Sequence, residues 1–244
     1  MTFATTPTAL NITEHASPQA LRCAIDLVAT LRARMIRVGL FGTFLYRPDP
    51  AVPSDPAQRI RELDILTDEV ETITRVCATL TRGSPLPDTP QIIADWIALT
   101  AAQMPDILAK IVQMDGLSRN VLTAAQSGSS QQRSALAEHM RVARDGFFDA
   151  VTTLCDALWD DIYAQHSLAL EQATEAALSL GDRLTRLDRI GKHVRLVSLN
   201  ASVEAARAGD VGKGLMVIAH EFKSLAEEIQ TLAKAARGDM DRIS

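Results

Sequence analysis

The stretch "LNASVEAARAGDVGKGLMVIAHEF", residues 199–222, decides how the C-terminal part of the chain folds. Gly209, Gly212 and Gly214 fall close together, whereas the sequence on either side consists of good helix formers. Glycine is favoured where a helix ends and where the backbone takes a positive φ, so the cluster predicts a reversal between two helices. The sequence therefore predicts an antiparallel helical hairpin with its tip at residues 209–214.

Both flanks of this tip carry residues at the spacing of a coiled coil. Before the tip, spacings of four and three alternate along one column: Ala173, Ala177, Leu180, Leu184, Leu187, Gly191, Val194, Ser198, Ala201, Ala205 and Ala208. After the tip, spacings of three and four give a second column: Leu215, Ile218, Phe222, Leu225, Ile229 and Leu232. We expect the two columns to face each other, most closely near the tip, where the side chains of the first column are small.

Composition favours an all-α protein. The chain has 244 residues, of which 47% are hydrophobic and only 4% aromatic, and its glycines and prolines are confined to a few places. A net charge of −5 offers no basic field for nucleic acid. The three cysteines, Cys23, Cys77 and Cys155, are far apart and are expected to be buried free thiols. With no apolar stretch near ~20 residues and no signal peptide, we expect a cytoplasmic protein without a transmembrane segment.

Proline and glycine divide the chain. We expect a polar lead over residues 1–17, a helical, sensor-like input domain over 18–126, and a long helix with the hairpin over 131–244, separated by "SGSS". The input domain is expected to hold a helix at 17–39, with Ser17 as its N-cap and Pro18 in its first turn, and a helix at 57–83 that ends near Gly83. Further helices are expected at 91–114 (interrupted or kinked at Pro105) and 117–126, with Trp96 in the core and a proline-rich loop at 46–56. Residues 131–208 lack proline and could form one long helix, but the arm after the tip is much shorter, so residues before about Ser167 are expected to fold back on the input domain.

The helix before the tip also carries residues that do not belong to its column. Leu196, Leu199 and Val203 form a second apolar stripe, and Asn200, Glu204 and Arg207 form a polar stripe beside it. One interpretation is an intrahelical Glu204–Arg207 pair beside apolar residues that pack within a four-helix dimer. The other is an interaction surface, because apolar strips rimmed by polar groups are typical of one.

The segment "LVSLNASVEAARAGDVGKGLMVIAHEFKSLAEE" closely resembles the kinase-control hairpin tip of bacterial methyl-accepting chemotaxis proteins. The resemblance covers roughly residues 190–229, and its LNA, EAARAG and GxG elements are highly specific. It implies a homodimer that forms a four-helix bundle, with a tip that contacts other receptor dimers and docks an adaptor protein and a histidine autokinase.

The resemblance also assigns residues. The implied contacts between receptor dimers are Leu196, Leu199, Asn200, Val203, Glu204, Arg207 and Glu221. The implied adaptor and kinase contacts are Asp210, Lys213, Gly214, Leu215 and Val217. The family usually has an aromatic residue where this chain has Lys192, a Phe in place of Leu215 and an Arg in place of Lys213, which puts the usual trimer of dimers in doubt. "EQATEAA", residues 171–177, is interpreted as a solvated charged face rather than a methylation site.

No motif for catalysis, metal or cofactor binding emerges from the sequence. The five histidines lack metal-ligand spacing, and the GxG at the tip follows no strand, so it is not a dinucleotide-binding loop. We expect no enzyme and no cofactor, although a ligand inside residues 18–165 stays open. The favoured function is chemoreceptor-like signal transduction through the kinase and its adaptor. The alternative is a non-chemotactic helical scaffold that uses the hairpin only to dimerise.

Overall fold

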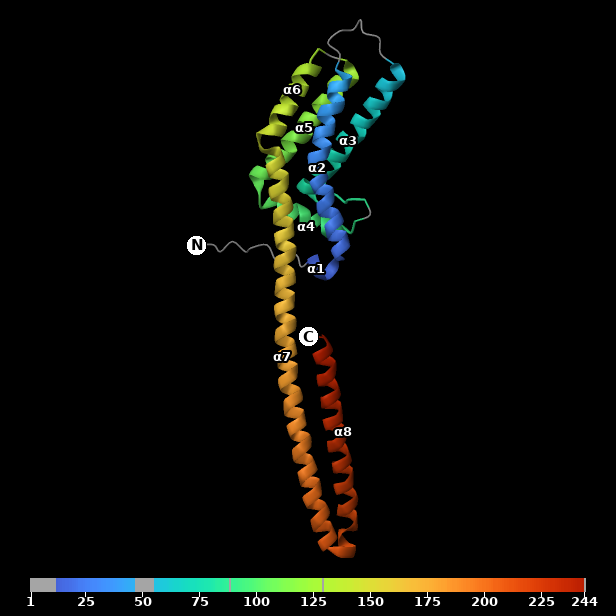
Figure 1. Cartoon of the computed structure of the whole chain (residues 1–244), viewed down its shortest axis with the longest axis vertical. Coiled ribbons are helices and arrows are strands. Elements are labelled where there is room, and N and C mark those ends of the chain that lie inside the picture. The colour runs from blue at the N-terminus through green and yellow to red at the C-terminus, as the bar shows by residue number, and fades with distance from the viewer. Residues whose placement is uncertain (1–11, 47–54, 88, 129, 244) are drawn as a thin grey trace, which may run out of the picture. The chain divides into compact units, whose positions relative to one another are not determined.

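The computed structural model describes residues 12–46, 55–87, 89–128 and 130–243, and every element within them is a helix (Figure 1). This agrees with the predicted all-α class. Contacts divide the chain into two compact units, Met1–His166 and Ser167–Ser244, which we describe separately. The boundary predicted at "SGSS", residues 127–130, falls instead inside the first unit.

The first unit begins with α1 (Ile12–His15), α2 (Pro18–Leu45) and α3 (Pro56–Arg82). The Ser17 side chain caps α2 by accepting a hydrogen bond from the Ala20 backbone N–H, as the sequence predicted. Gly83 ends α3 with a φ of 63°, a left-handed conformation in which glycine has no steric penalty. The predicted proline-rich loop at 46–56 lies largely outside the described residues.

The break predicted at Pro105 separates α4 (Gln91–Ala102) from α5 (Pro105–Ser127), with a bend of 111°. The separate short helix predicted at residues 117–126 is wrong, because α5 continues through Gly116 to Ser127. Within the described residues no single helix is both long and apolar enough to cross a membrane; only the bent pair of α4 and α5 reaches that length and composition when the two are taken together.

The proline-free run from residue 131 to 208 is not one helix. It forms α6 (Gln132–Val142), the short π-helical segment η1 (Ala143–Phe147) and α7 (Phe148–Arg207). Inside η1 the backbone leaves helical geometry, with a ψ of 43° at Asp145 and a φ of 99° at Gly146. Gly146 breaks the run because glycine alone adopts that φ freely.

The first unit has a continuous apolar core. It is formed mainly by α2, α3, α4 and α5, and the first turns of α7 contribute Val151, Leu154, Leu158 and Ile162 at helical spacing. Trp96 of α4 belongs to this core, as expected, and its indole N–H donates to Asp161 Oδ2 of α7 at 2.6 Å. These contacts hold the start of α7 within the first unit.

Charged side chains are also buried in this unit, each with a partner. Glu69 is nearly inaccessible and accepts hydrogen bonds from Arg34 at 2.8 Å and Arg37 at 2.7 Å.

Cys77 is buried as predicted, and burial raises the pKa of its thiol to about 12. Cys23 differs from the expectation, because it is exposed on α2.

The second unit is an antiparallel pair of helices. The part of α7 beyond His166 leads through the short 3-10 helix η2 (Gly209–Gly212) into α8 (Lys213–Ile243), which runs back beside α7 (Figure 1). The predicted hairpin is therefore present, and it carries the candidate site.

Candidate functional site

The reversal depends on glycines with different tasks. Gly209 has a φ of 60° and follows the last turn of α7, where the Ala208 N–H still bonds to the Glu204 carbonyl. Gly212 is buried against the backbone of Ala205, and a Cβ at this position would overlap the Ala205 carbonyl oxygen. Gly214 already lies in the first turn of α8 and has open space around it. Gly209 and Gly212 thus set the geometry of the turn.

The seam between the two helices is built from small residues at every seventh position. The buried members on α7 are Leu184, Gly191, Ser198 and Ala205. Those after the turn are Gly212 of η2 and Ala219, Ala226 and Ala233 of α8. Only alternate members of the predicted α7 column are therefore buried. The predicted α8 column is wrong as an intrachain seam, since most of its large residues are exposed.

Close approach of the two backbones explains why the buried column of α8 is the one with small side chains. A Cβ at Gly191 would lie 2.9 Å from Gln230 Cγ and 3.2 Å from the Ala226 carbonyl oxygen. Glycine and alanine permit such an approach, whereas leucine or phenylalanine in the same column would force the helices apart. The large residues of α8 are consequently displaced to the edges of the seam.

Polar contacts across the seam are few and exposed. Arg237 donates to the Thr185 hydroxyl at 2.8 Å, and Arg195 lies 3.8 Å from Glu227. Exposed pairs of this kind contribute at most about 1 kcal/mol. The fit of small residues, rather than ion pairs, therefore holds the hairpin closed.

One side of the hairpin is an exposed strip that we call the long apolar face. Its members lie three or six positions after residues of the seam, with Leu180 three after half-buried Ala177: Leu180, Leu187, Ile190 and Val197 on α7, and Leu215, Ile218, Phe222, Leu225 and Leu232 on α8. Because the helices are antiparallel, the same offset from the seam places both sets on one side of the pair. Their exposed fractions range from 44% to 65%, so nothing in the hairpin covers them.

The opposite side carries a shorter strip, confined to the tip, that we call the tip face. Its members are Leu196, Leu199 and Val203 on α7 and Met216 and Val217 on α8, with exposed fractions between 38% and 60%. The sequence indicated the α7 stripe but missed that Met216 lies on the same side. Met216 lies four residues after Gly212 and three before Ala219, and this spacing could have revealed its place beside the seam.

The structure does not gather every predicted contact residue on one surface. Asn200, Glu204 and Arg207 share one stripe on the back of α7, which borders the long apolar face at Glu204, seven residues after Val197. Glu221 lies on the back of α8. Glu204 and Arg207 form an exposed ion pair at 2.9 Å, as one sequence interpretation expected. At the apex, Lys213 pairs with Asp210 at 2.8 Å, and both side chains are highly exposed.

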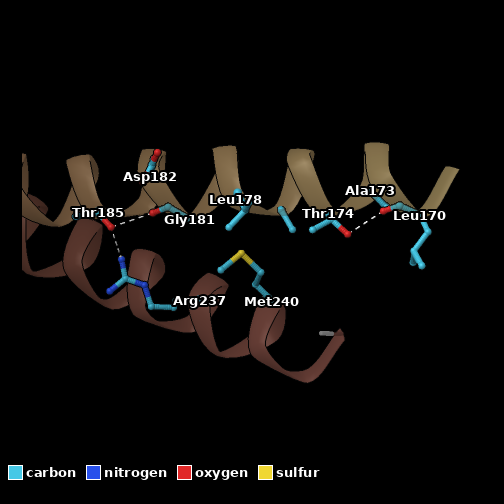
Figure 2. Close-up of a pocket in the computed structure, with 10 residues that line it drawn as sticks. Leu170, Ala173, Thr174, Leu178, Gly181, Asp182, Thr185, Arg237 and Met240 are labelled. Atoms are coloured by element: carbon cyan, nitrogen blue, oxygen red, sulfur yellow. Dashed lines mark hydrogen bonds between the residues drawn. The ribbon is translucent and has the colours of Figure 1, made fainter. Parts of the chain in front are cut away.

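A groove of about 780 Å³ opens between α7 and the last turns of α8. Figure 2 shows Arg237 and Met240 of α8 reaching toward α7, with Leu170, Leu178 and Gly181 opposite them. Leu170 and Leu178 are largely exposed, so the groove is an open surface rather than an enclosed cavity. Among the described residues, no group of three or more His, Cys, Asp or Glu side chains could hold a metal ion.

Comparison with known proteins finds a family that the hairpin is similar to. Residues 160–243 match the family model of the methyl-accepting chemotaxis protein (MCP) signalling domain. The hairpin is thus similar to an MCP signalling domain. The match covers the whole of α8 and both faces described above.

Several chemoreceptors are similar to this domain. McpN of Pseudomonas aeruginosa is 38% identical over 79 residues, which is 32% of this chain and 15% of the relative. CtpL of the same organism is 42% identical over 71 residues, covering 26% of this chain and 11% of the relative. The transducer protein Htr18 of Halobacterium salinarum is 47% identical over 49 residues, covering 20% and 6%. The chain thus spans a small part of these relatives, and no solved structure matches it.

Proposed function

We propose that this chain acts in chemoreceptor-type signal transduction in the cytoplasm, with the hairpin tip docking a histidine autokinase and its adaptor. One observation carries the proposal: the hairpin, which is similar to an MCP signalling domain, uses small residues to close its own seam and leaves large apolar residues exposed on two faces. Exposed apolar strips of this extent are typical of protein contacts. The role is physical, since the proposal requires binding and no catalytic group.

The long apolar face fits a second copy of the chain. It runs along much of the hairpin from Leu180 to the tip, and its heptad spacing is that of helices that pack on other helices. Two hairpins joined through it would form a four-helix bundle with these side chains as its core, apart from Leu215 beside the tip, which is assigned below to the adaptor and kinase. A homodimer is therefore the expected assembly.

The tip face and the apex are the proposed contacts with other proteins. We assign Leu196, Leu199, Asn200, Val203, Glu204, Arg207 and Glu221 to contacts between dimers. We assign Asp210, Lys213, Gly214, Leu215 and Val217 to the adaptor and kinase. The exposed apex supports this assignment, because Asp210 and Lys213 bond only to each other.

The first unit is the proposed input domain. A stimulus there would shift the packing of α7 against α8, and small seam residues suit such shifts because alternative packings differ little in shape. The tip would then present its contact residues differently to the kinase.

The assembly is tested by light scattering and by adaptor capture. Phe222→Glu places a charge on the long apolar face and should convert the dimer to a monomer, whereas Ser224→Glu, an exposed control two residues away, should leave the dimer intact. Lys213→Ala or Val217→Ala, at exposed positions assigned to the adaptor and kinase, should abolish their capture with unchanged helical content. Unchanged capture by both variants would refute the assigned contact residues.

The non-chemotactic scaffold is the second candidate, favoured by the length of the long apolar face, which would suffice for dimerisation alone. A wild-type dimer whose size is unaffected by the adaptor would support the scaffold over the signalling proposal.

A further inference from the structure

Helix α6 carries a buried imidazole without partners. His139 is fully inaccessible, and neither Nδ1 nor Nε2 has a hydrogen-bond partner among the described residues. Buried polar groups are nearly always paired, so an isolated one calls for an explanation in terms of function or stored strain. The remaining histidines of the chain that are described, including His166, are exposed.

The position of His139 leaves little space for water. It lies between Leu136 and Met140, which both pack against glycines of α2. Leu136 Cδ1 is 3.1 Å from where a Cβ of Gly42 would sit, and Met140 Sδ is 2.7 Å from the corresponding point at Gly39. Because α6 also packs against α5, a charged imidazole could gain hydration only if α6 moved away from both α2 and α5.

No charged group compensates a proton at this site. The charged residues on the elements packed against α6, and on α6 itself, are either exposed or paired elsewhere. Arg34 and Arg37 of α2 bond to Glu69, Asp115 of α5 bonds to Arg119 and Thr74, and Arg141 bonds to Glu138 and Asp145. The remaining charged residues on these elements are exposed. They are Arg22, Asp26 and Arg32 of α2, Asp106 and Lys110 of α5, Arg133 of α6 and Arg144 of η1. Burial alone lowers the pKa of His139 from its usual value near 6.5 to about 4.

A hinge lies next to α6. The non-helical backbone at Asp145 and Gly146 separates α6 from α7, so α6 can rotate there without unwinding α7. Breaks of this kind inside helical segments often mark functional positions.

We propose that α6 is a proton-operated flap, held on α2 and α5 while His139 is neutral and released about the η1 hinge when His139 takes up a proton. In the released state the imidazolium is hydrated, so proton uptake and opening are coupled. The direction follows from linkage: His139 binds a proton more weakly in the closed state, so the closed state is fully favoured at neutral pH and loses that advantage as the pH falls below 6.5.

The size of the effect follows from the two proton affinities. With a pKa near 6.5 when released and about 4 when closed, the equilibrium constant for opening should rise about 20-fold between pH 7 and pH 5. Opening should approach its limiting value below pH 4, where both states are protonated.

Hydrogen exchange on the full chain tests the flap. Protection factors, which correct for the intrinsic pH dependence of exchange, should fall about 20-fold for α6 between pH 7 and pH 5, while those of α3 in the same molecule stay constant. His139→Phe, which keeps a ring of similar size without a titrating group, should abolish the change, and His139→Leu serves as a second variant. His166→Phe, at an exposed histidine, should behave as wild type.

Nuclear magnetic resonance titration of the wild-type imidazoles gives an independent reading that needs no variant. His139 should titrate near pH 4, well below the ordinary imidazole value near 6.5. Titration of His139 near 6.5, constant α6 protection, or an equal loss of protection in α3 would overturn the proposal. Only the idea that acid is the signalling input of this chain rests on the proposed function. The exchange and titration measurements involve no kinase or adaptor, so the flap and the proposed function can each be refuted separately.

Discussion

Replacing Gly212 with alanine should open the turn of the hairpin. The new Cβ would overlap the Ala205 carbonyl oxygen and lie 2.9 Å from its carbon and 3.0 Å from its Cα. All three are backbone atoms, so no side-chain rotation relieves the clash, and the two sides of the turn must separate. Overpacking of this kind costs about 1–3 kcal/mol.

A matched control lies two residues away. Gly214 sits in the first turn of α8, and a Cβ there meets nothing within 4 Å. Gly214→Ala should stabilise the hairpin by about 0.4–1 kcal/mol, because alanine has fewer unfolded conformations than glycine. Alanine at position 212 restricts the unfolded chain in the same way, which offsets part of the cost of the clash. The net loss of hairpin stability is then about 1–2 kcal/mol.

Thermal unfolding followed by circular dichroism, at one protein concentration, compares the two variants. For a unit of this size, 1 kcal/mol corresponds to about 4–8 °C in Tm. Gly212→Ala should therefore lower the Tm of the hairpin by about 5–15 °C, whereas Gly214→Ala should raise it by a few degrees. Equal or higher stability of Gly212→Ala would show that the backbones at the tip are not in close contact, which would refute the small-residue seam there.

Three further predictions concern the first unit. Glu69→Ala removes a buried carboxylate from two arginines and should lower the unfolding free energy in urea by about 3 kcal/mol, whereas Glu138→Ala, at an exposed pair, should change it little. At pH 8 a thiol reagent should modify exposed Cys23 readily and buried Cys77, whose pKa is raised to about 12, only after denaturation. Since burial lowers the pKa of His139 to about 4, the unfolding free energy should fall by about 3 kcal/mol between pH 6.5 and pH 4 in wild type, and His139→Phe should lack this component.

Local signals in the sequence located most elements of the fold. Ser17 with Pro18 predicted the start of α2, Gly83 the end of α3, and Pro105 the break between α4 and α5. Each depends on the conformational preference of one or two residues, which neighbouring elements rarely change. The same reasoning failed at Gly146, which the sequence could not tell from a glycine tolerated inside a helix.

The candidate site was predicted in outline. The stripe of Leu196, Leu199 and Val203 was visible from helical spacing, and the structure leaves it exposed. The spacing did not reveal that Met216 of α8 lies on the same side of the helix pair, because that depends on how the two helices pack. The isolation of His139 had no sequence signal at all.

By itself the sequence determined that the chain is helical and that it reverses at residues 209–212, because helix propensity and the φ of Gly209 are local properties. It also carried the specific motif of the MCP signalling domain. Only the tertiary structure decided which column of α8 is buried. Both the alanine column of Ala219 and Ala226 and the larger column of Phe222 have coiled-coil spacing, and the close approach of α7 at Gly191 admits only the smaller one.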